Sequence, residues 1–156
     1  MIMRKESGFT LVEIMVTVTI IAILVAIAVP MWGQWLPSYR LKRATQDLYS
    51  SFQKAKMEAV RRNVNVVLIF DVAGQKYEMY VDSDRGFDSN EAKLGSYKIP
   101  DSVTLASASF SGSTSTAGFD SRGLPAGSRF GTVTLNNTKG ITRQIHLLVA
   151  GNIRIE

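Results

Sequence analysis

Apolar residues are concentrated near the N-terminus of the chain. From Phe9 to Val29 every residue except Glu13 is apolar or a threonine, and the next charged residue is Arg40. A helix rises ~1.5 Å per residue, so this run is long enough to cross a hydrocarbon core of ~30 Å. The pattern predicts a membrane-spanning helix with one carboxylate near its start.

A different helical pattern follows, from about Ser38 to Arg62. Apolar residues recur there at spacings of seven, four, three and four, which places them in one stripe along a helix. The stripe consists of Leu41, Leu48, Phe52, Ala55 and Ala59. Charged residues occupy much of the remaining surface and are interpreted as solvated. The stripe predicts that this half of the helix lies against a sheet.

Two prolines lie between these patterns. A proline inside a helix removes one backbone hydrogen bond and bends or breaks the helix. Pro30 therefore predicts a kink in one long helix. The alternative is that the helix ends at Pro30 and a second helix begins at Pro37, because proline suits the first turn of a helix.

After Asn63 the pattern changes to short β-branched and apolar runs separated by turn residues, which predicts antiparallel strands. The expected strands are 64–70, 76–81, 94–99, 103–105, 131–135, 142–149 and 152–156, with turns at 73–75 and at Asn136–Asn137. Residues 106–118 are almost wholly Ser, Ala, Thr and Gly, which predicts a flexible surface excursion or a weakly formed edge. The predicted fold is α+β: a long N-terminal hydrophobic helix continues into an amphipathic helix packed on an antiparallel β-sheet head.

Composition narrows the function classes. The chain has 156 residues, 18 Lys+Arg against 13 Asp+Glu, a net charge of +5, no cysteine and one histidine, His146. The missing cysteines exclude thiol catalysis, cysteine-based zinc sites and iron–sulfur clusters. No plausible nucleophile–base pair or metal cluster appears in the sequence. An enzyme is therefore not predicted, and no cofactor is expected.

The residues before the apolar run carry Arg4 and Lys5, which predicts that this end stays in the cytoplasm and that the head is exported. Three interpretations compete: a secretory signal peptide cut after Ala26-Ile27-Ala28, a plain single-span anchor, or a leader removed before the apolar run. A carboxylate in a membrane helix costs ~2–3 kcal/mol. Glu13 favours the third interpretation. Removal of such a leader leaves the apolar helix at the start of the mature protein, and in a filament of packed helices Glu13 can pair with the free α-amine of a neighbouring subunit.

The segment Gly8-Phe9-Thr-Leu-Val-Glu13, with basic residues before it and a long apolar run after it, resembles the leader of type IV pilins and type II secretion pseudopilins. The resemblance implies that a prepilin peptidase cuts between Gly8 and Phe9 and that the new Phe9 amine is N-methylated. It also implies that Glu13 neutralises this amine during subunit docking, and that Pro30 is the kink of a long first helix.

Head motifs are similar to one branch of this group, the GspH/FimT-like pseudopilins and minor pilins. Resemblance is found in Ala55–Asn63, in Phe119-Asp-Ser-Arg-Gly123-Leu-Pro, in Gly131–Leu135, at Arg143, and in Gly151-Asn-Ile-Arg-Ile155. Together with the leader, these motifs cover most of the chain. The resemblance implies a pilin-like fold.

Two groups of charged residues are candidate binding sites, and each also has a simpler interpretation. Asp82, Asp84 and Asp88, with Glu91 nearby, have the oxygen ligands that calcium prefers, but a solvated acidic turn is favoured because the spacing is not that of an EF-hand. Some FimT-like pilins bind DNA through a C-terminal Gly-Arg-x-Arg motif, of which this chain matches only the second arginine. The candidate DNA contacts are Arg143, Arg154, Lys139 and Arg129, and a solvated face is favoured there as well.

The sequence therefore predicts a minor pilin or pseudopilin that primes or caps a type IV pilus-type filament. Its expected parts are a cleaved leader at 1–8, a transmembrane or filament-core helix at 9–36 and a periplasmic pilin-like head at 37–156. Expected partners are the prepilin peptidase, a major pilin, other minor pilins or pseudopilins, and inner-membrane lipid before assembly. Before assembly we expect a single-pass inner-membrane protein, and afterwards a periplasmic or cell-surface filament. The alternatives are a DNA-binding minor pilin for DNA uptake and a GspH-type pseudopilin of type II secretion.

Overall fold

The computed structural model describes residues 8–89 and 91–156, apart from the side chains of 29–34. The chain divides into two compact units, and the boundary in the sequence lies between Leu36 and Pro37. The first unit holds the apolar part of the long helix, and the second unit is the head.

One helix, α1 (Leu11–Arg62), supplies all of the described helix in the first unit and the first element of the head. Its bounds include Pro37, so the alternative in which a second helix begins at that proline is wrong. Pro30 lies in the stretch whose side chains are outside the described residues, and the kink there stays a prediction. At the other end Asn63 has a φ of 55°, and Val64 N–H donates to the Ala59 carbonyl (3.3 Å). A left-handed residue with this bond is the usual way to end a helix.

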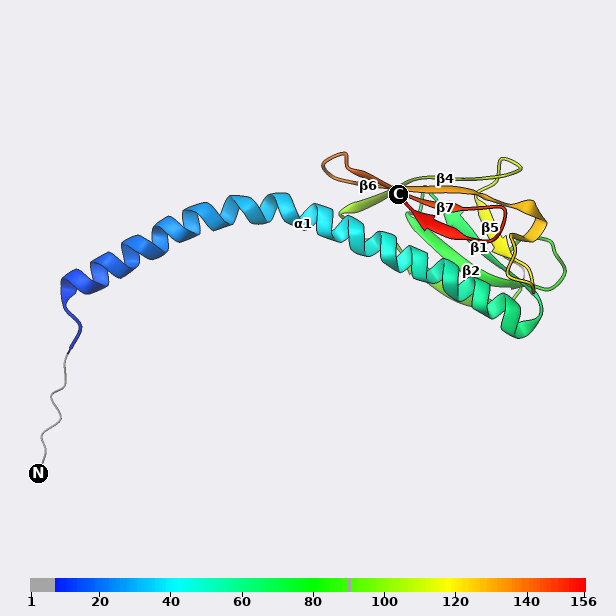
Figure 1. Ribbon diagram of the computed structural model, residues 1–156, viewed down its shortest axis with the longest axis horizontal. Helices are drawn as coiled ribbons and strands as arrows, with labels where there is room; N and C mark the ends of the chain where they lie inside the picture. Colours follow the sequence, from blue (N-terminus) through cyan, green and yellow to red (C-terminus); the bar gives the residue numbers. More distant parts are fainter. Residues whose placement is uncertain (1–7, 90) are drawn as a thin grey trace, which may run out of the picture. The chain divides into compact units, whose positions relative to one another are not determined.

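The head contains eight strands in two antiparallel sheets (Figure 1). Sheet A has the order β3-β2-β1-β5, with β1 at Asn65–Asp71, β2 at Lys76–Asp82, β3 at Lys93–Lys98 and β5 at Thr116–Phe119. Sheet B has the order β4-β6-β7-β8, with β4 at Val103–Phe110, β6 at Gly131–Asn137, β7 at Thr142–Leu147 and β8 at Ile153–Ile155. A short 3₁₀ turn, η1 (Ala126–Ser128), precedes β6. The predicted α+β head is confirmed, with two sheets where the sequence indicated strands without an order.

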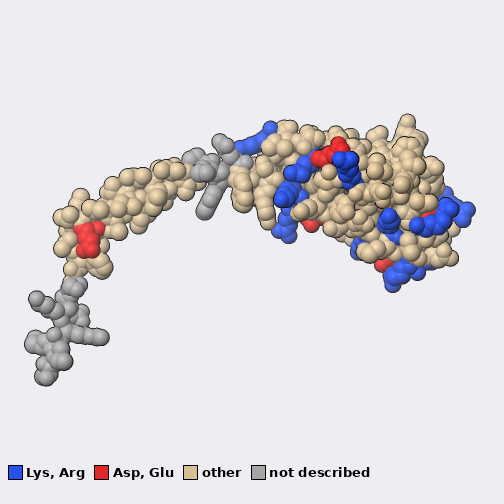
Figure 2. Space-filling view, in the orientation of Figure 1, with Lys and Arg blue, Asp and Glu red and all other residues tan. Residues whose placement is uncertain are grey.

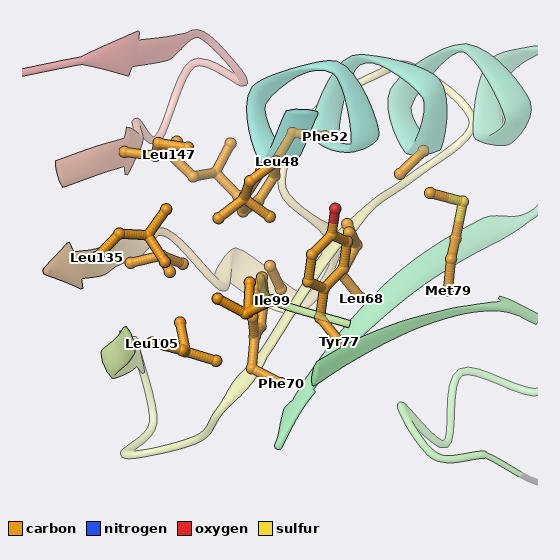
Figure 3. Close-up of a cluster of buried hydrophobic side chains, with 14 of the residues drawn as sticks. Leu48, Phe52, Leu68, Phe70, Tyr77, Met79, Ile99, Leu105, Leu135 and Leu147 are labelled. Atoms are coloured by element: carbon orange, nitrogen blue, oxygen red, sulfur yellow. The ribbon is translucent and has the colours of Figure 1, made fainter. Parts of the chain in front are cut away.

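The core of the head lies where the amphipathic half of α1 meets both sheets (Figure 3). All five residues of the predicted stripe, Leu41, Leu48, Phe52, Ala55 and Ala59, are at most 1% exposed. The Phe52 ring lies 5.9 Å from the Phe70 ring and 6.4 Å from the Phe119 ring, measured between centroids. The stripe is therefore the face through which α1 packs into the core that it shares with residues of both sheets.

Two segments of the head differ in detail from the expectation. The small-residue segment 106–118 forms edges and not one long excursion: β4, which continues to Phe110, and β5, whose four residues are all buried, are each the outermost strand of their sheet. Small residues are needed there, because a Cβ on Gly118 would lie 3.2 Å from the Val66 carbonyl oxygen. The turn expected at Asn136–Asn137 begins later, since β6 includes both residues and Asn137 Oδ1 accepts the N–H groups of Lys139 and Ile141 (both 2.9 Å).

Candidate processing and assembly site

Thr10 begins α1. Its carbonyl oxygen accepts the N–H of Ile14 (3.2 Å), and its Oγ1 accepts the N–H of Glu13 (3.2 Å). A hydroxyl that binds the third N–H of a helix is an N-cap, and it satisfies one of the donors that a helix start leaves open. Sequence analysis missed this role, although Thr10-Leu-Val-Glu13 has the spacing of a capping box.

Glu13 occupies the third position of the helix and is exposed. A negative charge in the first turn is favoured by the helix dipole. Among the described residues, none forms an ion pair with the Glu13 carboxylate. The carboxylate is therefore available to a positive group from outside the described chain.

The rest of the helix in the first unit has an apolar surface. Residues Leu11–Ala28 have a mean hydropathy of 2.7, and none of them is buried within the protein. Figure 2 shows this helix without charged atoms apart from the acidic atoms near its start. The Thr17 hydroxyl donates to the Glu13 carbonyl, and the Thr19 hydroxyl donates to the Met15 carbonyl (2.7 Å). Because both threonines are bonded within the helix, this surface suits contact with lipid or with other apolar helices.

Gly8 and Phe9 precede the helix in exposed, non-helical backbone. No atom lies within 4 Å of the position that a Cβ on Gly8 would occupy. The fold itself therefore sets no requirement for glycine at this position.

The acidic loop after β2 is held by its own carboxylates. Asp82, which is 2% exposed, accepts the Phe87 N–H (3.1 Å) and the Asn65 side-chain amide (3.3 Å). Glu91 accepts the N–H groups of Ser83 (2.7 Å) and Asp84 (3.0 Å), and the hydrogen bond from the Ser83 backbone is the main cause of its lowered pKa.

Carboxylate oxygens of Asp82, Asp84 and Glu91 lie within 4.8 Å of one another. Glu91 thus stands where the sequence analysis placed Asp88 in the candidate calcium set. The carboxylates of Asp82 and Glu91 each already accept hydrogen bonds from two protein donors. The calcium site stays a prediction that nothing in the structure supports beyond proximity.

The four candidate DNA contacts do not lie together. Arg143 is opposite the buried Leu135, whereas Arg154 is opposite His146 on the other face of sheet B. Arg129 and Lys139 lie just beyond opposite ends of β6. In Figure 2 the basic atoms are spread over the head, several of them beside acidic atoms.

Two of these four cations also have partners in the head. The Arg129 guanidinium lies 4.0 Å from the centroid of the Phe87 ring. Arg154 Nε lies 3.6 Å from Glu156 Oε1. A phosphate-binding surface needs several free cations in one place. The structure therefore does not bring these four candidate contacts together in one surface, which agrees with the favoured interpretation of a solvated face.

His146 is an ordinary residue of β7. Its Nδ1 lies 2.8 Å from Thr132 Oγ1, the residue opposite it on β6. Its Nε2 lies 3.4 Å from Glu156 Oε2. These contacts join β6, β7 and the C-terminus and indicate a structural role.

The mid-head motif that begins at Phe119 also has a structural role. Phe119 is buried against Phe52, and Asp120 accepts the N–H groups of Arg122 (2.9 Å) and Leu124 (3.0 Å). Gly123 follows with a φ of 76°, a conformation that favours glycine. The motif is a tight turn that leads from β5 towards sheet B.

Comparisons with known proteins agree with this geometry. A family profile described as "Type II transport protein GspH" matches residues 44–151, and one described as "Prokaryotic N-terminal methylation motif" matches residues 3–29. The chain is 28% identical over 159 residues to the pilin-like protein PilA1 of Thermus thermophilus, covering 97% of this chain and 99% of that protein. It is 29% identical over 102 residues to a fimbrial protein of Pseudomonas aeruginosa, covering 65% of this chain and only 62% of that relative's length.

Two solved structures have a similar fold. The type IV minor pilin FimU of Pseudomonas aeruginosa gives a TM-score of 0.60 at 18% identity, covering 78% of this chain and 92% of FimU. The minor pseudopilin EpsH from the type 2 secretion system of Vibrio cholerae gives 0.55 at 12% identity, covering 75% of this chain and 96% of EpsH. At these identities the likeness concerns the fold alone.

Proposed function

The chain belongs to the GspH family of type II transport proteins, the minor pilin and pseudopilin group of type IV pili and type II secretion, and we propose that it primes or caps assembly of such a filament. The predicted resemblance to type IV pilin-like proteins is confirmed by the family match and by the methylation motif. Proteins of this family are structural subunits. The apolar helix and the motif indicate a membrane anchor with the head outside the cytoplasm.

One observation carries the proposal: the exposed apolar helix has a single carboxylate, Glu13, just after an exposed Gly8–Phe9 bond. In the proposed sequence of events the helix first lies in the inner membrane, with its N-terminus in the cytoplasm and the head in the periplasm. A prepilin peptidase cuts before Phe9, and the new amine is methylated. The positively charged amine of one subunit then pairs with Glu13 of a neighbour.

The energetics favour this use of Glu13. A carboxylate in a membrane helix costs ~2–3 kcal/mol on insertion scales, and less near the interface. Pairing with a terminal amine among packed apolar helices offsets this cost, whereas a helix left alone in lipid keeps it. The carboxylate therefore favours the assembled form over the stored form.

The first test is the processing of a Gly8→Ala precursor in cells that contain a prepilin peptidase. We expect the eight-residue leader to be retained, visible as a larger product in mass spectrometry. Since nothing contacts this position, lost cleavage would report recognition by the peptidase. Thr10→Ser, which keeps the capping hydroxyl, is the matched control and should be cleaved normally. A normally processed Gly8→Ala chain would refute the leader assignment.

The second test separates assembly from processing. We expect Glu13→Gln to be cleaved at Gly8 but to enter filaments at least ~10-fold less well, because pairing with a buried amine is worth more than 1.4 kcal/mol. Glu13→Asp, which keeps the charge, should recover part of the loss. The measurement is the fraction of mature subunit in sheared filaments or in cross-linked subunit ladders. Equal incorporation of Glu13→Gln would exclude the proposed pairing.

The subunits that bind this chain would show whether it acts in a pilus or in a secretion system. Cross-linking of the mature chain in its own cells should capture either a major pilin or the pseudopilins of a secretion system. DNA uptake, the other alternative raised by the sequence, is not part of the proposed function because the four basic residues lie apart on the head.

A further inference from the structure

We propose that a basic hollow at the beginning of the head binds the phosphate of an anionic phospholipid headgroup. The basic hollow is formed by Arg40 and Arg43 of α1 and by Lys98 at the end of β3. The inference rests on the proposed function, since it requires a subunit that is stored in a membrane. It deepens that function by naming the surface that contacts the lipid.

The hollow lies between one side of α1 and the chain that connects β3 to β4. It has a volume of about 500 Å³. Its floor includes Ala44 and Ile99, which are buried residues of the core. A second hollow of about 560 Å³ continues along α1 and has these residues in common with the first. The basic side chains thus surround a depression whose floor is fixed by the core.

The cations of the hollow are only weakly neutralised. Arg43 Nε lies 4.0 Å from Asp47, and Lys98 Nζ lies 3.5 Å from Asp101, with all four side chains more than two-thirds exposed. Exposed pairs of this kind contribute little and exchange readily. Arg40 forms no ion pair with any residue that the structure describes. Guanidinium groups bind phosphate oxygens through two parallel hydrogen bonds, so an anionic headgroup is a better partner than the present ones.

Position in the chain points to lipid as the source of the phosphate. The candidate membrane span is Leu11–Ala28, and Arg40 follows twelve residues after Ala28. Arg40, Lys42 and Arg43 are the first charged residues after Glu13, and all three are positive. Three cations next to the exported end of a span oppose the usual charge bias of membrane proteins. Basic residues beside a span are attracted to anionic lipid. Binding of anionic lipid would therefore account for the positive charge of these three residues.

The test uses the full chain, which has no cysteine of its own. Ser102→Cys places a single environment-sensitive fluorophore at the rim of the hollow. The labelled protein is inserted into nanodiscs of phosphatidylcholine with an increasing fraction of phosphatidylglycerol. We expect a saturable change in emission as the anionic fraction rises, and its loss at high salt.

The variant Arg40→Gln/Arg43→Gln/Lys98→Gln should raise the anionic fraction at half-maximal change by about tenfold, since each basic residue adds to the attraction. The matched control, Arg122→Gln/Lys139→Gln/Arg154→Gln, removes the same charge from exposed residues elsewhere on the head and should leave the midpoint unchanged. A control that shifts the midpoint equally would reduce the effect to net charge and overturn the proposal.

Two further outcomes would also overturn it. An equal response to phosphatidylcholine alone would show that anionic headgroups are not recognised, and a full response to inorganic phosphate would indicate a site for free anions. Processing at Gly8 is measured on the same preparations. Normal cleavage without a lipid response leaves the proposed filament function standing and removes only the lipid-binding hollow.

Discussion

At the scale of single residues, the start of α1 combines two roles within four positions. Thr10 caps the helix, and Glu13 lies in the first turn, where its charge is compatible with the helix dipole. The same carboxylate has no ion-pair partner among the described residues. Glu13 is therefore compatible with its own helix and can also pair with a positive group of another subunit.

Tyr77 makes the stability of the head depend on pH in the alkaline range. It is 3% exposed, and its hydroxyl lies 2.9 Å from Ser51 Oγ. Burial, the main cause, raises the pKa of Tyr77 to about 12 from an ordinary value of 10. Between these values the folded protein keeps a proton that the unfolded chain loses, so stability is fully present below pH 10 and falls as the pH rises towards 12.

We therefore expect the free energy of unfolding to fall by about 2 kcal/mol between pH 9 and pH 12 because of Tyr77. Tyr77→Phe should cost about 1 kcal/mol at pH 8, where it removes the hydrogen bond to Ser51. It should then lose less stability at high pH than the unmodified chain. Urea titrations at several pH values measure both effects, and parallel curves for the two proteins would contradict the assignment.

At the scale of elements, α1 has opposite requirements along its length. Its first part is exposed on all sides and apolar, whereas its second part has one buried stripe and a charged outer side. Because only the second part has this stripe, only the second part packs into the core of the head. The first part keeps an apolar surface for lipid or for other helices.

Phe52 tests the contribution of the stripe. It is fully buried and contacts aromatic rings of both β1 and β5. Phe52→Ala should lower the free energy of unfolding by about 3–5 kcal/mol, because it leaves a cavity in the core. Met57→Ala, at a 65% exposed position of the same helix, is the matched control and should change it by less than ~1 kcal/mol. Similar losses in the two variants, measured by chemical denaturation, would show that the stripe does not carry the packing.

At the scale of the whole molecule, the two units have different surroundings. Every buried apolar residue of the core lies between Leu41 and Leu147, inside the head. The described part of the first unit contributes no buried residue and needs lipid or other helices around it. Folding of the head is therefore expected to be independent of the anchor.

This independence predicts the behaviour of residues 37–156 alone. The fragment should be soluble without detergent and unfold cooperatively, with a midpoint within ~3 °C of the head transition in the full chain, because no core contact is lost. Circular dichroism melts of both proteins measure the two midpoints. An aggregated fragment, or one without a cooperative transition, would show that the first part of the chain is needed for the head to fold.

The sequence by itself determined the features that depend on neighbouring residues. The apolar run, the stripe from Leu41 to Ala59 and the hairpin of β1 and β2 follow from periodicity and turn chemistry, and the leader follows from residue types at fixed offsets. The spacing of Thr10 and Glu13 also predicts the helix cap that the structure contains. These signals are local, so they survive without knowledge of the fold.

Only the tertiary structure decided what depends on distant segments. Alternation cannot be seen in the serine-, alanine- and threonine-rich residues around β5, and their burial follows from β5 pairing with β1, about fifty residues earlier. Strand register places Arg143 and Arg154 on opposite faces of sheet B, so these two candidate DNA contacts do not share a surface. The same long-range packing brought Lys98 beside Arg40 and Arg43. Contacts between residues far apart in the chain are set by how the elements pack, and no local pattern in this sequence specifies that packing.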